Sequence, residues 1–140
     1  MPQRDYLMQQ IEEMGYFLAS LIRRILKLKD DDKEQEITTA LHDSIQEKLS
    51  FNIDEAILIE NEAFWDLIKG HLTTENHMEK MAELLMLAGK SMHPVLSPER
   101  ISYLEKSLFM YTHLQETSTN YSFERRDKIL EIQQILRSLI

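Results

Sequence analysis

Hydrophobic positions along the first segment of the chain recur at alternating spacings of four and three residues. They are Leu7, Ile11, Met14, Leu18, Leu21, Ile25 and Leu28. This spacing is typical of the apolar stripe of an amphipathic α-helix. Acidic residues near its start and basic residues near its end complement the helix dipole. We therefore predict a long N-terminal helix that packs along its whole length and ends at the Asp30–Asp32 run.

Polar breaks divide the following segment into shorter helices. Asp31 and Glu34 have the spacing of a capping box for a second helix, whose buried face is formed by Ile37, Leu41, Ile45 and Leu49. Asn52 is placed to cap a short turn over 53–58. Asn61 is placed to cap the next helix, which carries Phe64, Trp65 and Ile68.

Three further helices are predicted in the C-terminal half. Asn76 and Glu79 have capping-box spacing, and the helix that follows carries Met78, Met81, Ala82, Leu85, Ala88, Gly89 and Met92. The His93–Pro94 pair ends this helix because proline disfavours helical geometry in the residue before it. Ser97 caps the next helix, which has Pro98 at its first position. Its expected buried face is Ile101, Leu104, Leu108 and Tyr111.

The last helix is predicted to begin at Ser122, with an apolar face at Ile129, Ile132, Leu136 and Leu139. The connections around 92–98 and 118–122 are short, and short links join antiparallel neighbours. No strand pattern or inter-domain linker interrupts the series. The expected fold is all-α, with residues 1–140 forming one domain in which the long first helix packs on antiparallel helical hairpins.

Two segments carry a resemblance to a known class of repeat. The stretch 103–111 with 121–125, Tyr-Leu-Glu-Lys-Ser-Leu-Phe-Met-Tyr and Tyr-Ser-Phe-Glu-Arg, resembles the second helix of a tetratricopeptide repeat (TPR) running into another helix. The opening Arg-Asp-Tyr-Leu-Met-Gln-Gln-Ile-Glu at 4–12 is similar to the start of an uncharacterised bacterial family of small helical proteins with TPR-like C-terminal halves. The resemblance implies a TPR-like fold and no particular reaction.

Composition narrows the function classes. Hydrophobic residues make up 43% and charged residues 29% of the chain, and glycine and proline number three each, which favours long helices with few turns. The formal net charge of −8 provides no basic field for nucleic acid. Cysteine is absent, which excludes disulfides and thiolate chemistry and is compatible with a reducing compartment.

The charge order of residues 1–29 is the reverse of that in a secretory signal, and the longest uncharged run there, 14–22, is too short to cross a bilayer. We therefore expect a cytoplasmic protein without a membrane span. The basic run over 23–29 is a possible contact for anionic lipid or RNA. The simpler interpretation is that its apolar residues are core and its cations complete the helix end.

Candidate chemistry is sparse. The five histidines form no HxxxH pair, and only the cluster His71, Glu75, His77 and Glu79 offers a metal-site alternative. The acid pairs lie at expected helix ends or polar faces, where capping and solvation explain them. There is no glycine-rich phosphate loop and no serine-hydrolase elbow. We predict no catalytic residue, no metal ligand and no cofactor.

Several apolar and basic positions leave a choice between core and binding surface. Met81 is expected in the core and Met86 on the surface, and one of Phe64 and Trp65 should enter the core. The Arg125–Arg126 pair runs against the usual dipole preference at a helix start. Either an acidic partner or a neighbouring acidic side chain would account for it.

The leading functional hypothesis is a non-catalytic helical module that binds a protein or peptide partner, or acts as a scaffold. Its candidate binding residues are Phe109, Tyr111, Tyr121 and Arg125. One alternative is a homodimer that pairs through the stripe of the first helix, which spans several heptads. Another is a metal-binding protein or enzyme built around the segment from His71 to Glu79.

Overall fold

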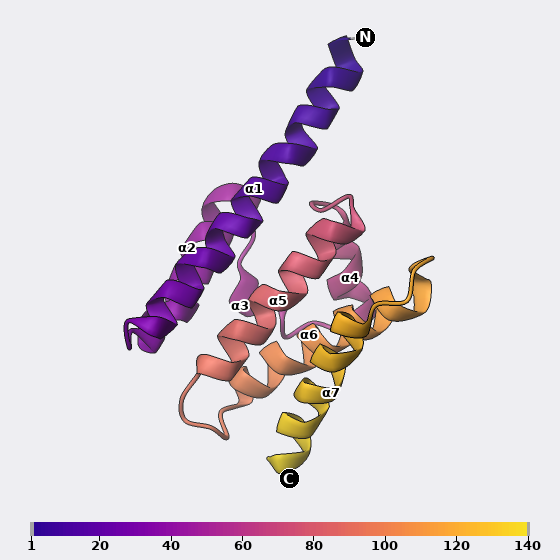
Figure 1. Cartoon of the computed structure of the whole chain (residues 1–140). Helices are drawn as coiled ribbons and strands as arrows, with labels where there is room; N and C mark the ends of the chain where they lie inside the picture. The colour runs from indigo at the N-terminus through magenta and orange to yellow at the C-terminus, as the bar shows by residue number, and fades with distance from the viewer. Residues whose placement is uncertain (1, 140) are drawn as a thin grey trace.

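The computed structural model describes residues 2–139, and within that range the regular elements are helices with no strand. Seven α-helices and one 3₁₀ turn, η1, follow one another: α1 (Pro2–Asp30), η1 (Glu34–Glu36), α2 (Ile37–Leu49), α3 (Ile53–Ala56), α4 (Asn61–Lys69), α5 (Glu75–Ser91), α6 (Pro98–Thr117) and α7 (Phe123–Ser138). Figure 1 shows their arrangement. The all-helical prediction is confirmed.

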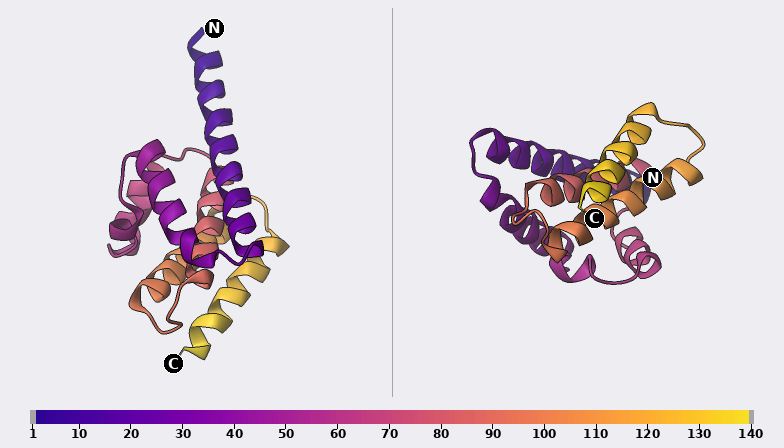
Figure 2. Two further views of the ribbon diagram at one scale, coloured as in Figure 1. Left: turned by 90° about the vertical axis from the view of Figure 1, so that its left-hand side faces the viewer. Right: turned by 90° about the horizontal axis from the view of Figure 1, so that it is seen from below.

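Helix α1 is only half covered by the rest of the molecule. Leu18, Leu21 and Ile25 are 0%, 4% and 0% exposed, whereas Leu7 and Ile11, on the same face, are 57% and 41% exposed. The N-terminal half stands clear of the other helices in Figure 1 and in the left view of Figure 2. The expectation that α1 packs along its whole length was therefore wrong, because the remaining helices, which we call the body, cover only its C-terminal half.

The caps of the three following helices were predicted in part. Asn52 caps α3 as expected, since its side chain accepts a hydrogen bond from the Glu55 backbone N–H at 3.2 Å. The Asp31–Glu34 capping box does not form: η1 follows Lys33 without a side-chain cap, and α2 begins only at Ile37. Asn61 is the first residue of α4 and not its cap, and its side-chain oxygen accepts a hydrogen bond from Lys106.

Helix α5 is central and packs against α1, α2 and α6. Its cap is Thr74, whose hydroxyl accepts from the His77 backbone N–H at 3.0 Å, so the prediction of Asn76 as cap was wrong. Met81 is fully buried as predicted. Met86, expected on the surface, is 6% exposed because α5 has neighbours on several sides.

Helices α5 and α6 lie in close contact along their length (Figure 1). Ser97 caps α6 with Pro98 at its start, as predicted, and accepts a hydrogen bond from the Arg100 backbone N–H at 3.1 Å. The Arg100 guanidinium in turn donates to the carbonyls of Gly89 and Lys90 at the end of α5, both at 3.1 Å. The buried start of α6 thereby satisfies carbonyls that the end of α5 leaves free.

Helix α7 begins after Ser122 as predicted, and the Ser122 hydroxyl accepts from the Arg125 backbone N–H at 3.1 Å. Between Phe123 and Ser138 it buries only Arg125 and Ile132. Long charged side chains reach from α7 to α5. The ion pairs are Arg125–Glu79, Lys128–Glu83 at 3.4 Å and Glu131–Lys90 at 3.3 Å. Its attachment to α5 is therefore largely ionic.

Across the described range, the helices fall short of the combined length and apolar character that a bilayer crossing requires.

Candidate functional site

The four predicted binding residues do not share one surface. Tyr111 is fully buried and Arg125 is 6% exposed, whereas Tyr121 is 60% exposed. Phe109 is half-buried and packs on α4. The structure brings Tyr111 and Arg125 to the region between α5 and α7, and it leaves Tyr121 at the turn before α7.

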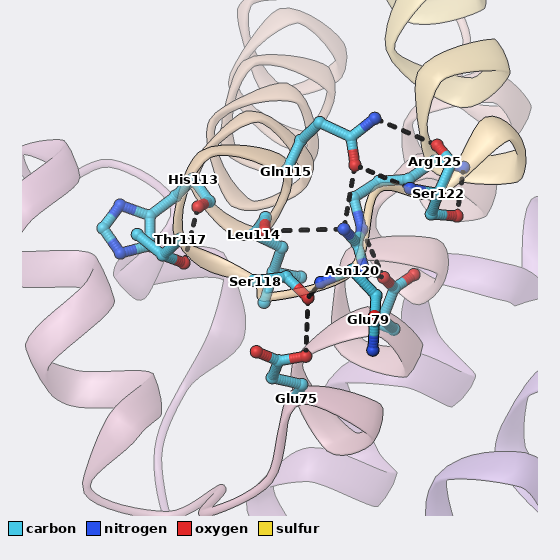
Figure 3. A network of polar contacts seen from close by, with 10 residues as sticks. All are labelled: Glu75, Glu79, His113, Leu114, Gln115, Thr117, Ser118, Asn120, Ser122 and Arg125. Atoms are coloured by element: carbon cyan, nitrogen blue, oxygen red, sulfur yellow. Dashed lines mark hydrogen bonds and ion pairs between the residues drawn. The ribbon is translucent and has the colours of Figure 1, made fainter.

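Arg125 is the centre of a network that joins three helices (Figure 3). Its Nε and Nη2 atoms donate to Glu79 of α5, and its Nη1 donates to the Gln115 side-chain oxygen at 2.9 Å and to the Leu114 carbonyl at 3.4 Å. The Gln115 amide nitrogen donates to the Ser122 carbonyl at 2.9 Å. A neighbouring acidic side chain, and not an external partner, therefore accounts for this arginine.

The Tyr111 ring lies beneath the same ion pairs, with the Lys128 Nζ 5.7 Å from its centroid. Burial raises the pKa of its hydroxyl, and the carboxylates of Glu83, Glu79 and Glu131 raise it further. The hydroxyl has no hydrogen-bond partner among residues 2–139. Tyr111 thus stays protonated and serves as core.

Phe109 belongs to an aromatic cluster between α4 and α6. The Trp65 ring lies 4.2 Å from the His113 ring and 6.1 Å from the Phe109 ring, measured between centroids. Both Trp65 and Phe109 are half-buried, and Phe64 beside Trp65 is fully buried. The prediction that one residue of the Phe64–Trp65 pair enters the core is confirmed.

The Tyr121 side chain is exposed to solvent, and its ring packs edge to face on the Phe123 ring, with ring centroids 5.3 Å apart. Phe123 is itself 66% exposed, and the Arg126 guanidinium lies 5.1 Å from its ring centroid. This exposed pair is small, because the neighbouring residues of the turn are polar.

The segment from His71 to Glu79 does not converge on a metal site. His71 stacks on Phe51 at 5.1 Å, His77 hydrogen-bonds to α1, and Glu79 pairs with Arg125. Glu75 instead accepts from the Ser118 hydroxyl at 3.1 Å. In the described range, no group of three or more His, Asp or Glu side chains is arranged to hold a metal ion.

One histidine–carboxylate pair that the sequence did not single out lies between α2 and α3. The His42 Nδ1 is 2.9 Å from one oxygen of Asp54, and the buried Tyr103 hydroxyl donates to the other at 2.6 Å. Thr38 and Thr39 line the adjoining cavity of about 270 Å³. The arrangement ties α2, α3 and α6 together.

A row of exposed apolar side chains lies on the N-terminal half of α1. Leu7, Met8 and Ile11 are 57%, 52% and 41% exposed and continue the stripe that is buried further along the helix. A groove of about 490 Å³ runs beside them. Its lining is Leu7, Gln10, Ile11, Glu13 and Met14 from α1, and Lys48, His71, Thr73 and His77 from the body. We call this surface the α1 groove.

His77 anchors α1 at the edge of this groove. Its side chain is 3% exposed, and its Nε2 lies 3.0 Å from the Ile11 carbonyl. Since a carbonyl only accepts, Nε2 carries the proton, and Nδ1 is left buried without a partner in the described range. Burial lowers the pKa of His77 and the cation of Lys80 lowers it further, against an opposing effect of the Ile11 carbonyl.

We expect acidification to weaken the fold through His77. Its folded-state pKa lies below the unfolded value, so the unfolded chain binds the proton more readily and stability falls as the pH drops below about 6.5. The measurement is urea unfolding at pH 7.5 and 5.5 for wild type and His77→Gln, which keeps a donor but does not titrate. The variant should lose less stability between the two pH values. Equal losses would contradict this assignment.

Comparison of the chain with models of protein families, with curated proteins and with solved structures found no match. The class of this protein is therefore defined by its fold and by the α1 groove. The chain is a small all-helical protein that exposes an amphipathic helix beside an apolar groove.

Proposed function

We propose that this protein is a non-catalytic helical interaction module that binds a protein partner through the α1 groove. One observation carries the proposal: the apolar face of α1 continues past the body, with Leu7 57% exposed on the face where Leu18 is fully buried. Contiguous exposed apolar surface of this kind is typical of protein-binding sites. An amphipathic helix lying beside an apolar groove suits helix-in-groove recognition.

The length of the free segment supports the same function. A helix rises 1.5 Å per residue, so residues 2–13 extend about 18 Å. The segment continues the buried half of α1, but its own apolar side chains are exposed to water in the single chain. A bound helix would remove Leu7 and Ile11 from water and stabilise the segment that holds them.

The C-terminal helices belong to the proposal as a TPR-like scaffold, in keeping with the sequence resemblance. What supports this part is the close approach of α5 and α6 at Gly89, Leu104 and Tyr103, and the packing of α7 on α6. In this scheme the scaffold holds α1 and the walls of the groove, and the exposed Tyr121 lies apart from the binding surface. A cytoplasmic location stays a prediction, supported by the absence of cysteine.

We expect a photo-crosslinking amino acid at Leu7 to capture a partner when the full chain is expressed in cells of its source. The control is the same amino acid at Gln9, which lies two residues on and about 200° around the helix. A discrete adduct should form from position 7, should be absent from position 9, and should weaken when Ile11→Glu is added. No adduct, or equal adducts from both positions, would overturn the proposed function.

A further inference from the structure

The side chain of His77 joins the N-terminal half of α1 to α5. Its Nε2 donates to the Ile11 carbonyl at 3.0 Å, whereas the side-chain hydrogen bonds of Gln9 and Gln10 stay within α1. Of the apolar side chains in this half, Met14 packs half-buried against the core, and those on the two preceding turns are exposed. Few contacts therefore attach the N-terminal half of α1 to the body, and one of them comes from a titratable ring.

The buried position of the His77 ring accommodates its neutral form only. Since a carbonyl accepts, Nε2 carries the hydrogen, and Nδ1 is buried without a partner in the described range. Protonation would add an N–H at Nδ1 and a positive charge to a side chain that is 3% exposed. An unpaired buried donor that also carries charge is costly, so the protonated ring is more stable where it reaches water.

Charged groups face His77 from several elements. His77 lines the α1 groove and a second cavity of about 480 Å³. The other titratable side chains around these two cavities are Glu12, Glu13 and Tyr16 of α1, Lys48 of α2, His71, and Lys80 of α5. Burial lowers the pKa of His77, the Ile11 carbonyl raises it, and the Lys80 cation lowers it. The carboxylates on α1 do not reverse the net direction, which favours the neutral ring.

Gly15 lies one helical turn beyond Ile11, where the His77 ring approaches α1. A Cβ at this position would be 3.6 Å from Nε2, so the ring lies beside bare helix backbone. Glycine makes a helix interior less stable than alanine does and leaves the backbone freer to bend. Leu18 is the first fully buried position along α1, and from there the helix is held on the body. The point of easiest bending thus lies between the His77 contact and the buried half of α1.

We propose that protonation of His77 releases residues 2–14 of α1 from the body, with Gly15 as the hinge, while the buried half of α1 stays in place. In the released state the ring reaches water and has an ordinary pKa of about 6.5. The docked state has a lowered pKa, so the released state binds the proton more readily and its share rises as the pH falls below about 6.5. The release requires no partner, so its failure would leave the proposed function intact.

Native-state hydrogen exchange on the purified full chain tests the release. The backbone N–H groups of 15–17 should exchange through bending at Gly15, and those of 22–25 through global unfolding. Protection at 15–17 should fall up to about tenfold from pH 7.5 to 5.5, after division by the intrinsic exchange rate. Because release exposes little surface, this protection should not respond to urea below the unfolding transition, whereas protection at 22–25 should fall.

His77→Gln, with His71→Gln as the matched control, tests which group responds to pH. Both variants remove a histidine that lines the α1 groove. The pH effect at 15–17 should vanish in His77→Gln and persist in His71→Gln. Circular dichroism at both pH values verifies that each variant is folded. A pH effect that persists in His77→Gln, or one urea dependence shared by 15–17 and 22–25, overturns the release.

Gly15→Ala tests the hinge with His77 in place. The new Cβ makes ordinary contact with the ring, and alanine resists bending. Protection at 15–17 should therefore rise about two- to fivefold at both pH values, and the pH effect should remain. Unchanged protection at 15–17 would contradict Gly15 as the hinge.

Discussion

Replacing Arg125 with alanine should cost about 2–3 kcal/mol of unfolding free energy, because removal of one member of a buried ion pair leaves the other without compensation. The Arg125 guanidinium is buried, pairs with Glu79, and donates hydrogen bonds to the Gln115 side chain and to the Leu114 carbonyl. Glu79 is 31% exposed, so water relieves part of the loss. Urea unfolding followed by circular dichroism measures the change.

The adjacent Arg126 is the matched control. It is exposed and pairs with Asp127 on its own helix, so Arg126→Ala should change stability by less than about 0.5 kcal/mol. Both variants remove the same charge from the same turn of α7. Similar losses for the two would show that net charge, and not the network in Figure 3, holds α7 in place.

Gly89→Ala should destabilise the protein by about 1–2 kcal/mol, although alanine is the better helix former. A Cβ at position 89 would lie 2.8 Å from the Leu104 Cγ and 3.2 Å from the Tyr103 Cβ. Both neighbours are fully buried, so α6 has to move away from α5 to make room. Thermal and urea unfolding should report the loss without a change in helix content.

The same substitution at Gly15 should have the opposite sign. A Cβ there would meet only the His77 ring, at 3.6 Å from Nε2, which is ordinary contact. Gly15→Ala should therefore stabilise α1 by about 0.5–1 kcal/mol through helix propensity alone. A loss at position 15 as large as that at position 89 would contradict the assigned role of close α5–α6 packing.

Local signals in the sequence predicted the helices well. Ser97 and Ser122 cap their helices as expected, because a small polar residue directly before an apolar period leaves few alternatives. The predicted caps Asn61 and Asn76 were wrong because each has another residue nearby that can precede the helix. Capping propensity ranks neighbouring residues without deciding between them.

The candidate site depends on tertiary contacts that the hydrophobic periodicity of the sequence does not reveal. Leu7 and Leu21 have the same place in the heptad repeat of α1, yet only Leu21 is covered. Arg125 and Arg126 are identical in type and adjacent, and only the direction of α7 decides which faces Glu79. The groove beside α1 could not be predicted because its walls come from three separate segments.

The unbroken course of α1 from its free end into the core has a consequence for how this chain can vary. One inserted or deleted residue between Ile11 and Leu18 would turn the free end by about 100° relative to the core. Leu7 would then face away from the groove while Leu18, Leu21 and Ile25 kept their places. Single substitutions in this segment can be tolerated. Its length in residues is under a separate constraint, because that length sets the rotation of the free end relative to the core.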